Sequence, residues 1–220
     1  MVVPAMLVAA TALFTLGAFV VGSIPFGYLI GRFVYRTDIR TQGSGNIGAM
    51  NALRTLGKGG AIAVLLLDAA KGFLPTLLPF VVLAGKAGAW DIAAVIASIG
   101  AAAAVLGHCF SPWLGWKGGK GVATSIGAIF ALSWKAGIVV VLAYAAGALA
   151  ITQYSSVGSM LANIVAPVAL WIFSRSLAEA AYGIFAAAFI LWTHRENVAR
   201  LKGGTENRIR LFRKAREREE

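Results

Sequence analysis

The sequence predicts an all-α integral membrane protein, built as a bundle of seven transmembrane helices. Of its 220 residues, 59% are apolar and only 13% are charged, against about 25% in a typical soluble domain. Long apolar runs alternate with short segments that hold most of the charge. The net charge of +11 is therefore not gathered on a nucleic-acid-binding face, and we expect no nucleic-acid partner.

Seven apolar runs give the predicted helices in order. A bilayer core of about 30 Å needs about 20 helical residues, and the fourth and fifth runs are short for this purpose. The alternative is one helix over 122–152, which would place Lys135 near the middle of the membrane at a cost of a few kcal/mol. We favour two helices, because Ser133, Trp134 and Lys135 suit an interfacial turn with tryptophan at headgroup level. The runs cover residues 4–33, 58–84, 90–110, 122–134, 136–152, 156–173 and 177–194.

Basic residues set the predicted orientation. With seven helices, the loops after the first and third runs and the C-terminal segment share one side and hold most of the 20 Lys and Arg residues. By the positive-inside rule, the N-terminus is outside and the C-terminus is cytoplasmic. The first run lacks a basic n-region and is long enough to span a bilayer, so we expect it to be retained rather than cleaved. Residues 1–207 form one transmembrane domain, and 208–220 form a basic tail that either contacts anionic headgroups or serves solubility and orientation.

The first polar segment, TQGSGNIGAMNALR at residues 41–54, is rich in glycine and in uncharged donors. Glycines allow backbone amides to approach an anion, and Arg54 offers a planar fork of donors that matches phosphate. Ser44, Asn46 and Asn51 add hydroxyl and amide donors. The segment is either one wall of an anion site or an ordinary flexible loop, since glycine patterns are weak signals.

A second polar segment, GHCFSPWLGWKGGKG at residues 107–121, follows the third run. Pro112 ends that helix by removing a donor, and the KGGKG run then precedes the next helix. Lys117 and Lys120 flank the amides of Gly118 and Gly119, which favours an anion site at a helix N-terminus. The spacing is not that of a nucleotide P-loop, and two lysines on a flexible cytoplasmic loop are the simpler alternative.

The third polar segment, THRENVARLKGGTE at residues 193–206, follows the last run. In a continuing helix, His194 and Asn197 share one face. His194 either exchanges a proton near neutral pH or caps the span at the water interface. Between the fifth and sixth runs, Ser156 either serves the same pocket or caps a helix.

Acidic residues and histidines are too few for a metal site. The chain has three aspartates (Asp38, Asp68 and Asp91) and two histidines, and Asp68 is expected to pair with Lys71 inside the membrane. These counts argue against a Mg²⁺ carboxylate site and a zinc site. The three segments therefore predict phosphate handling on one membrane face without a metal or another cofactor.

The quoted motifs, together with GSGNIGAMNALRTLGKGG, LLLDAAKG and GHCFSPWLGWKGGKGVAT, resemble the signature regions of the bacterial acyl-phosphate:glycerol-3-phosphate acyltransferases over nearly the whole chain. Gln153 and Ser155 depart from the residues that relatives often carry, and the basic tail extends past the last motif. The resemblance implies acyl transfer from acyl phosphate to the sn-1 hydroxyl of glycerol 3-phosphate, giving lysophosphatidic acid and inorganic phosphate. It places the protein in the bacterial cytoplasmic membrane, among membrane lipids, with its active site facing the cytoplasm. We expect it to act as a monomer.

The resemblance also suggests roles for the polar residues. His194 either removes the hydroxyl proton or positions glycerol 3-phosphate, whose own phosphate would then be the base. The amides of Gly118 and Gly119 are candidates for stabilising the oxyanion. His194, Asn197 and Ser44 are the expected catalytic residues. The expected phosphate-binding and orienting residues are Ser44, Asn46, Asn51, Arg54, Lys117, Gly118, Gly119, Lys120 and Ser156.

A transporter or channel for a phosphorylated anion is the main competing interpretation, because glycines and cations on one face also suit binding without chemistry. Transporters usually show inverted repeats and helices broken near the midplane, and the sequence shows neither. A phosphatidyltransferase would need an aspartate-rich metal motif, which the chain lacks. We therefore favour the enzyme.

Cys109→Ala is expected to leave activity nearly intact. Acyl phosphate is already an activated donor, so the reaction needs no acyl-enzyme on the chain's one cysteine. Steady-state release of lysophosphatidic acid by wild type and variant tests this expectation. A variant that folds but is inactive would contradict it.

Overall fold

The computed structural model describes residues 2–209, which fold into α-helices with no β-strand among them. Short 3₁₀ turns at Ile39–Thr41 and Pro112–Leu114, and a π-helical turn at Ala146–Ile151, lie in the connections. The expected basic tail lies outside the described residues apart from Arg208 and Ile209. The α-helices are α1 (Val2–Ser23), α2 (Phe26–Phe33), α3 (Ala49–Thr55), α4 (Gly57–Val82), α5 (Trp90–Cys109), α6 (Val122–Leu132), α7 (Trp134–Ala145), α8 (Ser155–Ser174), α9 (Leu177–Thr193) and α10 (Arg195–Lys202).

All seven apolar runs are helical, but they differ in their ability to cross a membrane. Within the described residues, five helical segments are long and apolar enough to span one, and α9 with α10, bent by 54°, makes a sixth. Helix α6 has 11 residues, which rise about 16 Å, roughly half of a bilayer core. The all-helical membrane architecture is confirmed, whereas seven crossings and the orientation stay predictions.

The connection between α6 and α7 confirms that residues 122–152 form two helices. Ser133 has extended backbone angles (φ −154°), and its Oγ accepts a hydrogen bond from the Ala136 amide at 3.4 Å. Trp134 is exposed, as an interfacial tryptophan should be. A short polar cap, rather than a charge buried in mid-helix, therefore separates the two segments.

The first apolar run is one helix in the prediction and two in the structure. Helix α1 ends at Ser23, and α2 begins at Phe26. Pro25 between them has no amide hydrogen to continue the helical ladder, which accounts for the interruption. The carbonyls of Ser23 and Ile24 at the break accept hydrogen bonds from Ser111 and Lys71, as described below.

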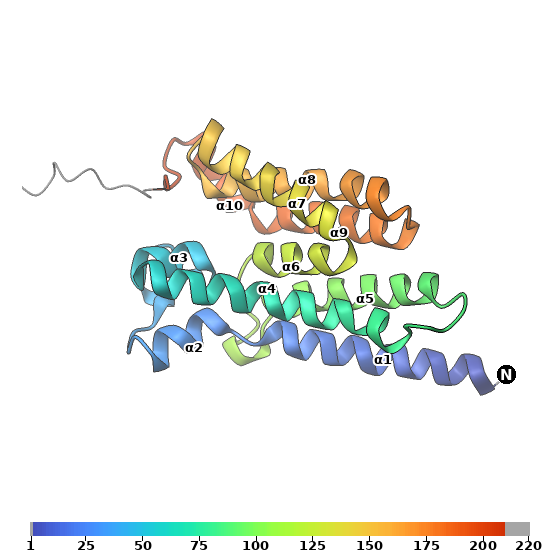
Figure 1. The fold of residues 1–220 in the computed structure, drawn as a ribbon. Coiled ribbons are helices and arrows are strands. Elements are labelled where there is room, and N and C mark those ends of the chain that lie inside the picture. Colours follow the sequence, from blue (N-terminus) through green and yellow to red (C-terminus); the bar gives the residue numbers. More distant parts are fainter. Residues whose placement is uncertain (1, 210–220) are drawn as a thin grey trace, which may run out of the picture.

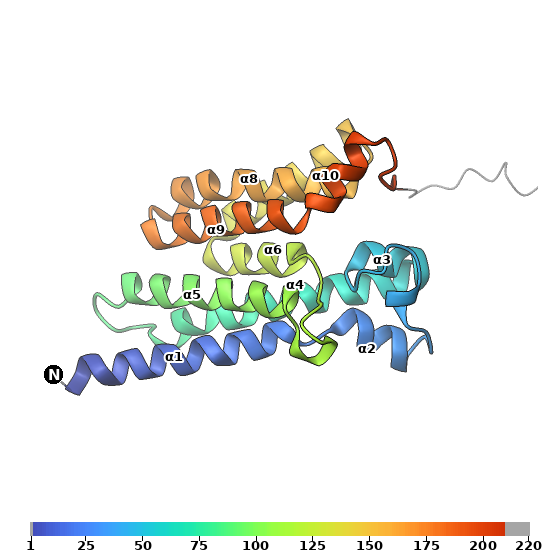
Figure 2. The same cartoon turned by 180° about the vertical axis from the view of Figure 1, so that it is seen from behind.

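The helices lie side by side in two groups (Figures 1 and 2). Helices α1, α4 and α5 form one group, α7, α8 and α9 form the other, and α6 lies between them. Helices α3 and α10 gather at one end of the bundle, while the start of α1 lies at the other end. The polar segments of the sequence are thereby brought to one end.

Small residues allow α4 and α6 to touch backbone to backbone. A Cβ on Gly72 would overlap the Thr124 carbonyl, and a Cβ on Gly127 would overlap the Ala69 carbonyl. Such close approach is typical of helix pairs in membranes, where packing replaces the hydrophobic effect as the driving force. It places the start of α6 directly against the turn of α4 that carries Asp68.

The predicted Asp68–Lys71 pair is present and has a third partner. Lys71 Nζ lies 2.8 Å from Asp68 Oδ1 and donates a hydrogen bond to the Ile24 carbonyl at 2.7 Å. Both side chains are only 2% exposed. At the same break, Ser111 Oγ donates to the Ser23 carbonyl at 2.7 Å. Lys71 thus ties α4 to the α1–α2 break, where the Ile24 carbonyl also accepts from the Phe26 amide at 3.1 Å.

Lys71→Met is expected to destabilise the fold by about 3–5 kcal/mol, because it leaves the buried Asp68 carboxylate without its partner. Unfolding of detergent-solubilised protein by heat or denaturant measures the effect. Lys135→Met is the control, since Lys135 is an exposed cation beside the Trp134 ring. Equal stability of the two variants would contradict the role assigned to the pair.

Candidate active site

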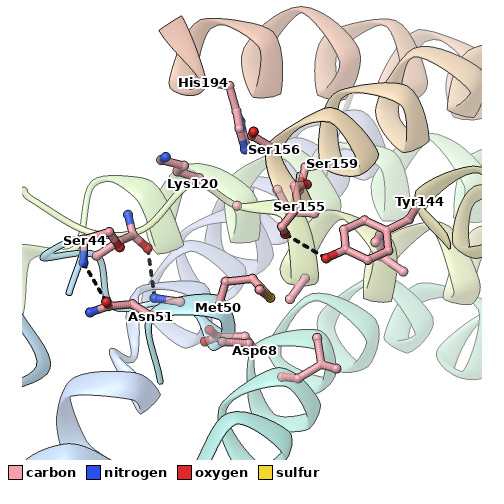
Figure 3. Close-up of a pocket in the computed structure, with 18 of the residues that line it drawn as sticks. Ser44, Met50, Asn51, Asp68, Lys120, Tyr144, Ser155, Ser156, Ser159 and His194 are labelled. Atoms are coloured by element: carbon pink, nitrogen blue, oxygen red, sulfur yellow. Dashed lines mark hydrogen bonds between the residues drawn. The ribbon is translucent and has the colours of Figure 1, made fainter. Parts of the chain in front are cut away.

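A cavity of about 530 Å³ lies at the polar end of the bundle. Its walls come from α3 and the loop before it, from α4, the end of α5, α6 and the residues before it, α7 and α8, and from the segment that follows α9. One part is lined by hydroxyl, amide and charged groups, including Ser44, Arg54, Lys120 and Asn197. Another part is apolar. Figure 3 shows the labelled side chains converging on this space from several helices.

The apolar part forms a trough between α4, α6 and α7. Leu65, Leu66, Ile126, Phe130 and Val141 line it. Leu66 is 62% exposed and Val141 is 41% exposed on the outside of the bundle. This part of the cavity therefore borders the surface that lipid would cover, and it can take an alkyl chain from the side.

The segment of residues 41–54, a loop followed by most of α3, forms one wall of the polar part, and Asn51 holds the loop in shape. Asn51 Oδ1 accepts from the Ser44 amide at 2.8 Å, and its Nδ2 donates to the Ile39 carbonyl at 2.7 Å. Gly43 has φ +59°, and a Cβ there would also overlap Asn51 Oδ1. The amide of Asn51 is thus committed to the loop, while Ser44 and Arg54 also line the cavity.

Asn46 supports the start of α3. Its Oδ1 accepts a hydrogen bond from the Gly48 amide at 2.9 Å, and Gly48 is the residue that caps α3. Asn46 also lines the cavity. Asn46 Oδ1, expected from the sequence to contact substrate, therefore accepts a hydrogen bond within the turn before α3.

Only one end of the KGGKG segment reaches the cavity. Lys120 lines it, whereas Lys117, Gly118 and Gly119 do not. The Gly118 and Gly119 amides donate to the carbonyls of Cys109 and His108 at 2.9 and 3.0 Å. These amides are already paired with the end of α5, so the structure does not bring them to a developing oxyanion.

Lys120 is held by the segment after α9. Its Nζ donates to Asn197 Oδ1, and its carbonyl accepts from Thr193 Oγ1 at 3.1 Å. Burial and the nearby Arg200 guanidinium lower the pKa of Lys120. The geometry presents one ammonium group, rather than two, to the polar part of the cavity.

His194 follows the last residue of α9 and is buried. Its Nδ1 lies 2.8 Å from the Ile190 carbonyl, and a carbonyl only accepts, so Nδ1 carries the hydrogen. Burial and the Lys120 charge lower the pKa of His194 to about 4. The ring is therefore neutral near pH 7, with Nε2 as an acceptor, and Figure 3 shows it directed toward Ser156.

Glu206 is a site residue that the sequence motifs did not single out. Its Oε1 accepts from Asn197 Nδ2 at 2.6 Å, and its Oε2 accepts from Arg200 Nε at 2.8 Å. Burial acts to raise the pKa of Glu206, but these hydrogen bonds hold it below its usual value. Glu206 thus places a negative charge in the polar part of the cavity, beside Arg200 and near Lys120 and Arg54. We call this part the polar mouth. Glu206 is the last residue of the third polar segment. It lies nine residues after Asn197, a spacing that does not place two residues on the same face of a helix.

Other lining residues also come from outside the predicted set. Tyr144 and Ser155 are joined by a hydrogen bond of 2.7 Å across the π-helical turn (Figure 3). Ser159, His108 and Asp68 line the same cavity. A tyrosine in an apolar helix carries no sequence signal of this kind. His108 and Asp68 lay within recognised motifs, but only the packing of α4 against α5 shows that they meet.

Ser156 is buried and lines the cavity, as predicted, whereas Cys109 is buried and does not line it. Within residues 2–209, no group of three His, Cys, Asp or Glu side chains is arranged to hold a metal ion. Independence from metal remains a prediction that rests on the sequence.

Fold and cavity together define a class: a helical membrane protein with a cationic polar mouth joined to a lipid-facing apolar trough. The family model described as glycerol-3-phosphate acyltransferase matches residues 12–204. The chain belongs to this family. Relatives of that name from Synechococcus sp. (strain JA-2-3B'a(2-13)) and Rhodopseudomonas palustris (strain BisB5) are 42% and 44% identical, covering 88% and 86% of this chain and 92% and 90% of theirs.

Two solved structures are also similar. Both are crystal structures of PlsY (YgiH), an integral membrane glycerol 3-phosphate acyltransferase, one in its glycerol 3-phosphate form and one in its lysophosphatidic acid form. The TM-scores are 0.82 and 0.80, with 34% and 32% identity. The matches cover 91% of this chain in both cases, and 96% and 95% of the PlsY chains. Family membership favours the enzyme over the transporter.

Arg54→Lys is expected to lower kcat/KM for glycerol 3-phosphate by roughly 100-fold. The charge is retained, but an ammonium group cannot reproduce the two parallel hydrogen bonds of a guanidinium. Steady-state kinetics on the purified variant measure this loss. Arg195→Lys is the matched control, because Arg195 pairs with the Trp192 ring and carbonyl instead. Near-wild-type kinetics of Arg54→Lys would remove Arg54 from the site.

Proposed function

We propose that this protein transfers an acyl group from acyl phosphate to the sn-1 hydroxyl of glycerol 3-phosphate, releasing lysophosphatidic acid and inorganic phosphate. The observation that carries the proposal is the joining of a cationic mouth to a lipid-facing trough in one cavity. The substrates require this combination, because one carries an alkyl chain and both carry phosphate. Family membership supports the acceptor and the reaction type.

The phosphates bind at the polar mouth. Arg54, Lys120 and Arg200 surround it, and the hydroxyls of Ser44 and Ser156 supply neutral donors. Glu206 balances part of this charge in the free protein, so the cations do not repel one another without compensation. Asn197 orients the substrates indirectly, by holding Lys120 and Glu206 in place.

The hydroxyl oxygen of glycerol 3-phosphate attacks the acyl carbonyl carbon directly. A new carbon–oxygen bond forms, and the bond from the carbonyl carbon to the phosphate oxygen breaks with phosphate as the leaving group. His194 Nε2 accepts a hydrogen bond from the attacking hydroxyl and orients it. A ring whose pKa is about 4 holds a proton poorly, so the proton passes to a phosphate oxygen. No acyl-enzyme forms, because the donor is already activated.

The polar end of the bundle faces the cytoplasm in the bacterial inner membrane, with the N-terminus outside and seven crossings in all. The distribution of Lys and Arg supports this orientation, since the loops at the polar end carry most of them. Glycerol 3-phosphate then reaches the mouth from water, and the acyl chain reaches the trough from lipid. The protein acts as a monomer, because one chain supplies every group that the proposal uses.

The direct test gives purified protein acyl phosphate and glycerol 3-phosphate in the presence of EDTA, without acyl-CoA or acyl carrier protein. The expected result is equimolar release of phosphate and lysophosphatidic acid. Loss of activity in EDTA that Mg²⁺ restores would overturn metal independence. Activity with acyl-CoA alone would overturn the proposed donor.

His194→Phe is expected to lower kcat by roughly 10- to 100-fold, since a phenyl ring keeps the shape of the imidazole but has no acceptor at the position of Nε2. The shape of the pH–rate profile between about pH 6 and pH 8 is expected to stay the same, because the wild-type ring is already neutral in that window. Initial rates across this range measure both effects. An inflection that disappears in the variant would identify His194 as the proton acceptor.

A further inference from the structure

His108 lies next to the KGGKG segment and is almost fully buried. Its side chain is 3% exposed and lines the inner wall of the cavity. Its carbonyl accepts the Gly119 amide at 3.0 Å. A Cβ on Gly119 would overlap Nε2 of the imidazole. The ring and the glycine are therefore in contact, with no room for a side chain between them.

The other ring nitrogen of His108 faces the buried ion pair of α4. Nδ1 lies 3.6 Å from Asp68 Oδ1 and makes no hydrogen bond to another described residue. Asp68 is itself fixed by Lys71, which is anchored to the α1–α2 break. The imidazole thus lies between a fixed carboxylate of α4 and the glycine segment. The position of the glycine segment therefore depends on the position of α4.

The glycine segment is held from the opposite side by the chain after α9. The Lys120 carbonyl accepts from Thr193 Oγ1, and Lys120 Nζ donates to Asn197. Gly119 and Lys120 are adjacent, so a shift of the glycine against His108 also moves the lysine. The location of the one KGGKG ammonium group in the cavity depends on both supports.

We propose that His108, held against Asp68, is a positioning residue that sets the place of Lys120 in the phosphate-binding mouth. Gly119 is required because its missing side chain leaves space for the imidazole. This inference rests on the proposed function, since it assigns Lys120 to a substrate phosphate. It assigns His108 no contact with the reacting atoms.

The test combines Gly119→Ala, His108→Ala and the double variant. Gly119→Ala is expected to lower kcat/KM for glycerol 3-phosphate by roughly 100-fold, because its Cβ displaces the ring and the neighbouring Lys120. His108→Ala is expected to cost about 10-fold, chiefly as a raised KM. The double variant is expected to match His108→Ala and to regain about 10-fold over Gly119→Ala, because the added Cβ then meets no ring.

Two outcomes of these kinetic comparisons overturn the inference, in addition to the absence of any effect. One is a double variant as slow as the product of the two single losses, which would show that the two changes act independently. The other is a loss of activity in Gly119→Ala and His108→Ala that is confined to kcat, while calorimetry shows unchanged binding of glycerol 3-phosphate. Rescue of activity in a double variant cannot come from simple misfolding, so the comparison stays decisive even where His108→Ala lowers stability.

Ser98→Ala is the matched control, since Ser98 is another buried polar residue of α5 whose hydroxyl makes no hydrogen bond to a described residue. Its kinetics are expected to equal those of wild type. A wild-type protein that forms no lysophosphatidic acid would overturn the proposed function. Active wild type with no effect of Gly119→Ala or His108→Ala would overturn this inference alone.

Discussion

The buried ion pair between Asp68 and Lys71 is the interaction on which the rest of the site depends. An isolated charge inside a membrane is costly, and a backbone carbonyl without a donor adds several kcal/mol. Lys71 neutralises Asp68 and also donates to the Ile24 carbonyl at the α1–α2 break, which accepts a further hydrogen bond from the Phe26 amide. Asp68 then faces His108 under the glycine segment. One turn of α4 therefore joins the break in the first apolar run to the wall of the cavity.

The polar mouth solves an electrostatic problem that any phosphate site shares. Arg54, Lys120 and Arg200, which we propose to bind phosphate, line the same cavity, and without an anion they repel one another. Glu206 offsets this repulsion by accepting a hydrogen bond from Arg200. It also accepts a hydrogen bond from Asn197, the residue that receives the Lys120 hydrogen bond. Burial, together with the charges of Lys120 and Arg200, lowers the pKa of His194 and keeps its ring neutral. The charged cluster therefore contributes to the neutral state of the histidine, whereas the Ile190 carbonyl sets its tautomer.

The sequence predicted those features that periodicity and residue chemistry encode. Apolar runs located the helices, Ser133 marked the break before α7, and the motif residues Ser44, Arg54, Lys120, His194 and Asn197 do line one cavity. The break at Pro25 was missed because hydropathy is continuous through it. The roles of Gly118, Gly119 and Asn51 depend on which backbone partner is nearest, and sequence spacing does not contain that information. Glu206 and Tyr144 reach the cavity only through tertiary packing.

The short α6 brings the polar and apolar parts of the cavity next to each other. Its 11 residues rise about 16 Å, so Lys120 before it lies within the bundle rather than at the level of a full-length span. Glycines at 118, 119 and 121 allow the chain to enter there, since a Cβ on any of them would crowd α5 or His108. In the proposed reaction, the ammonium group therefore meets phosphate beside the start of the apolar trough. A longer α6 would move Lys120 away from the trough and separate the cation from the acyl carbonyl, so the short helix suits the proposed chemistry.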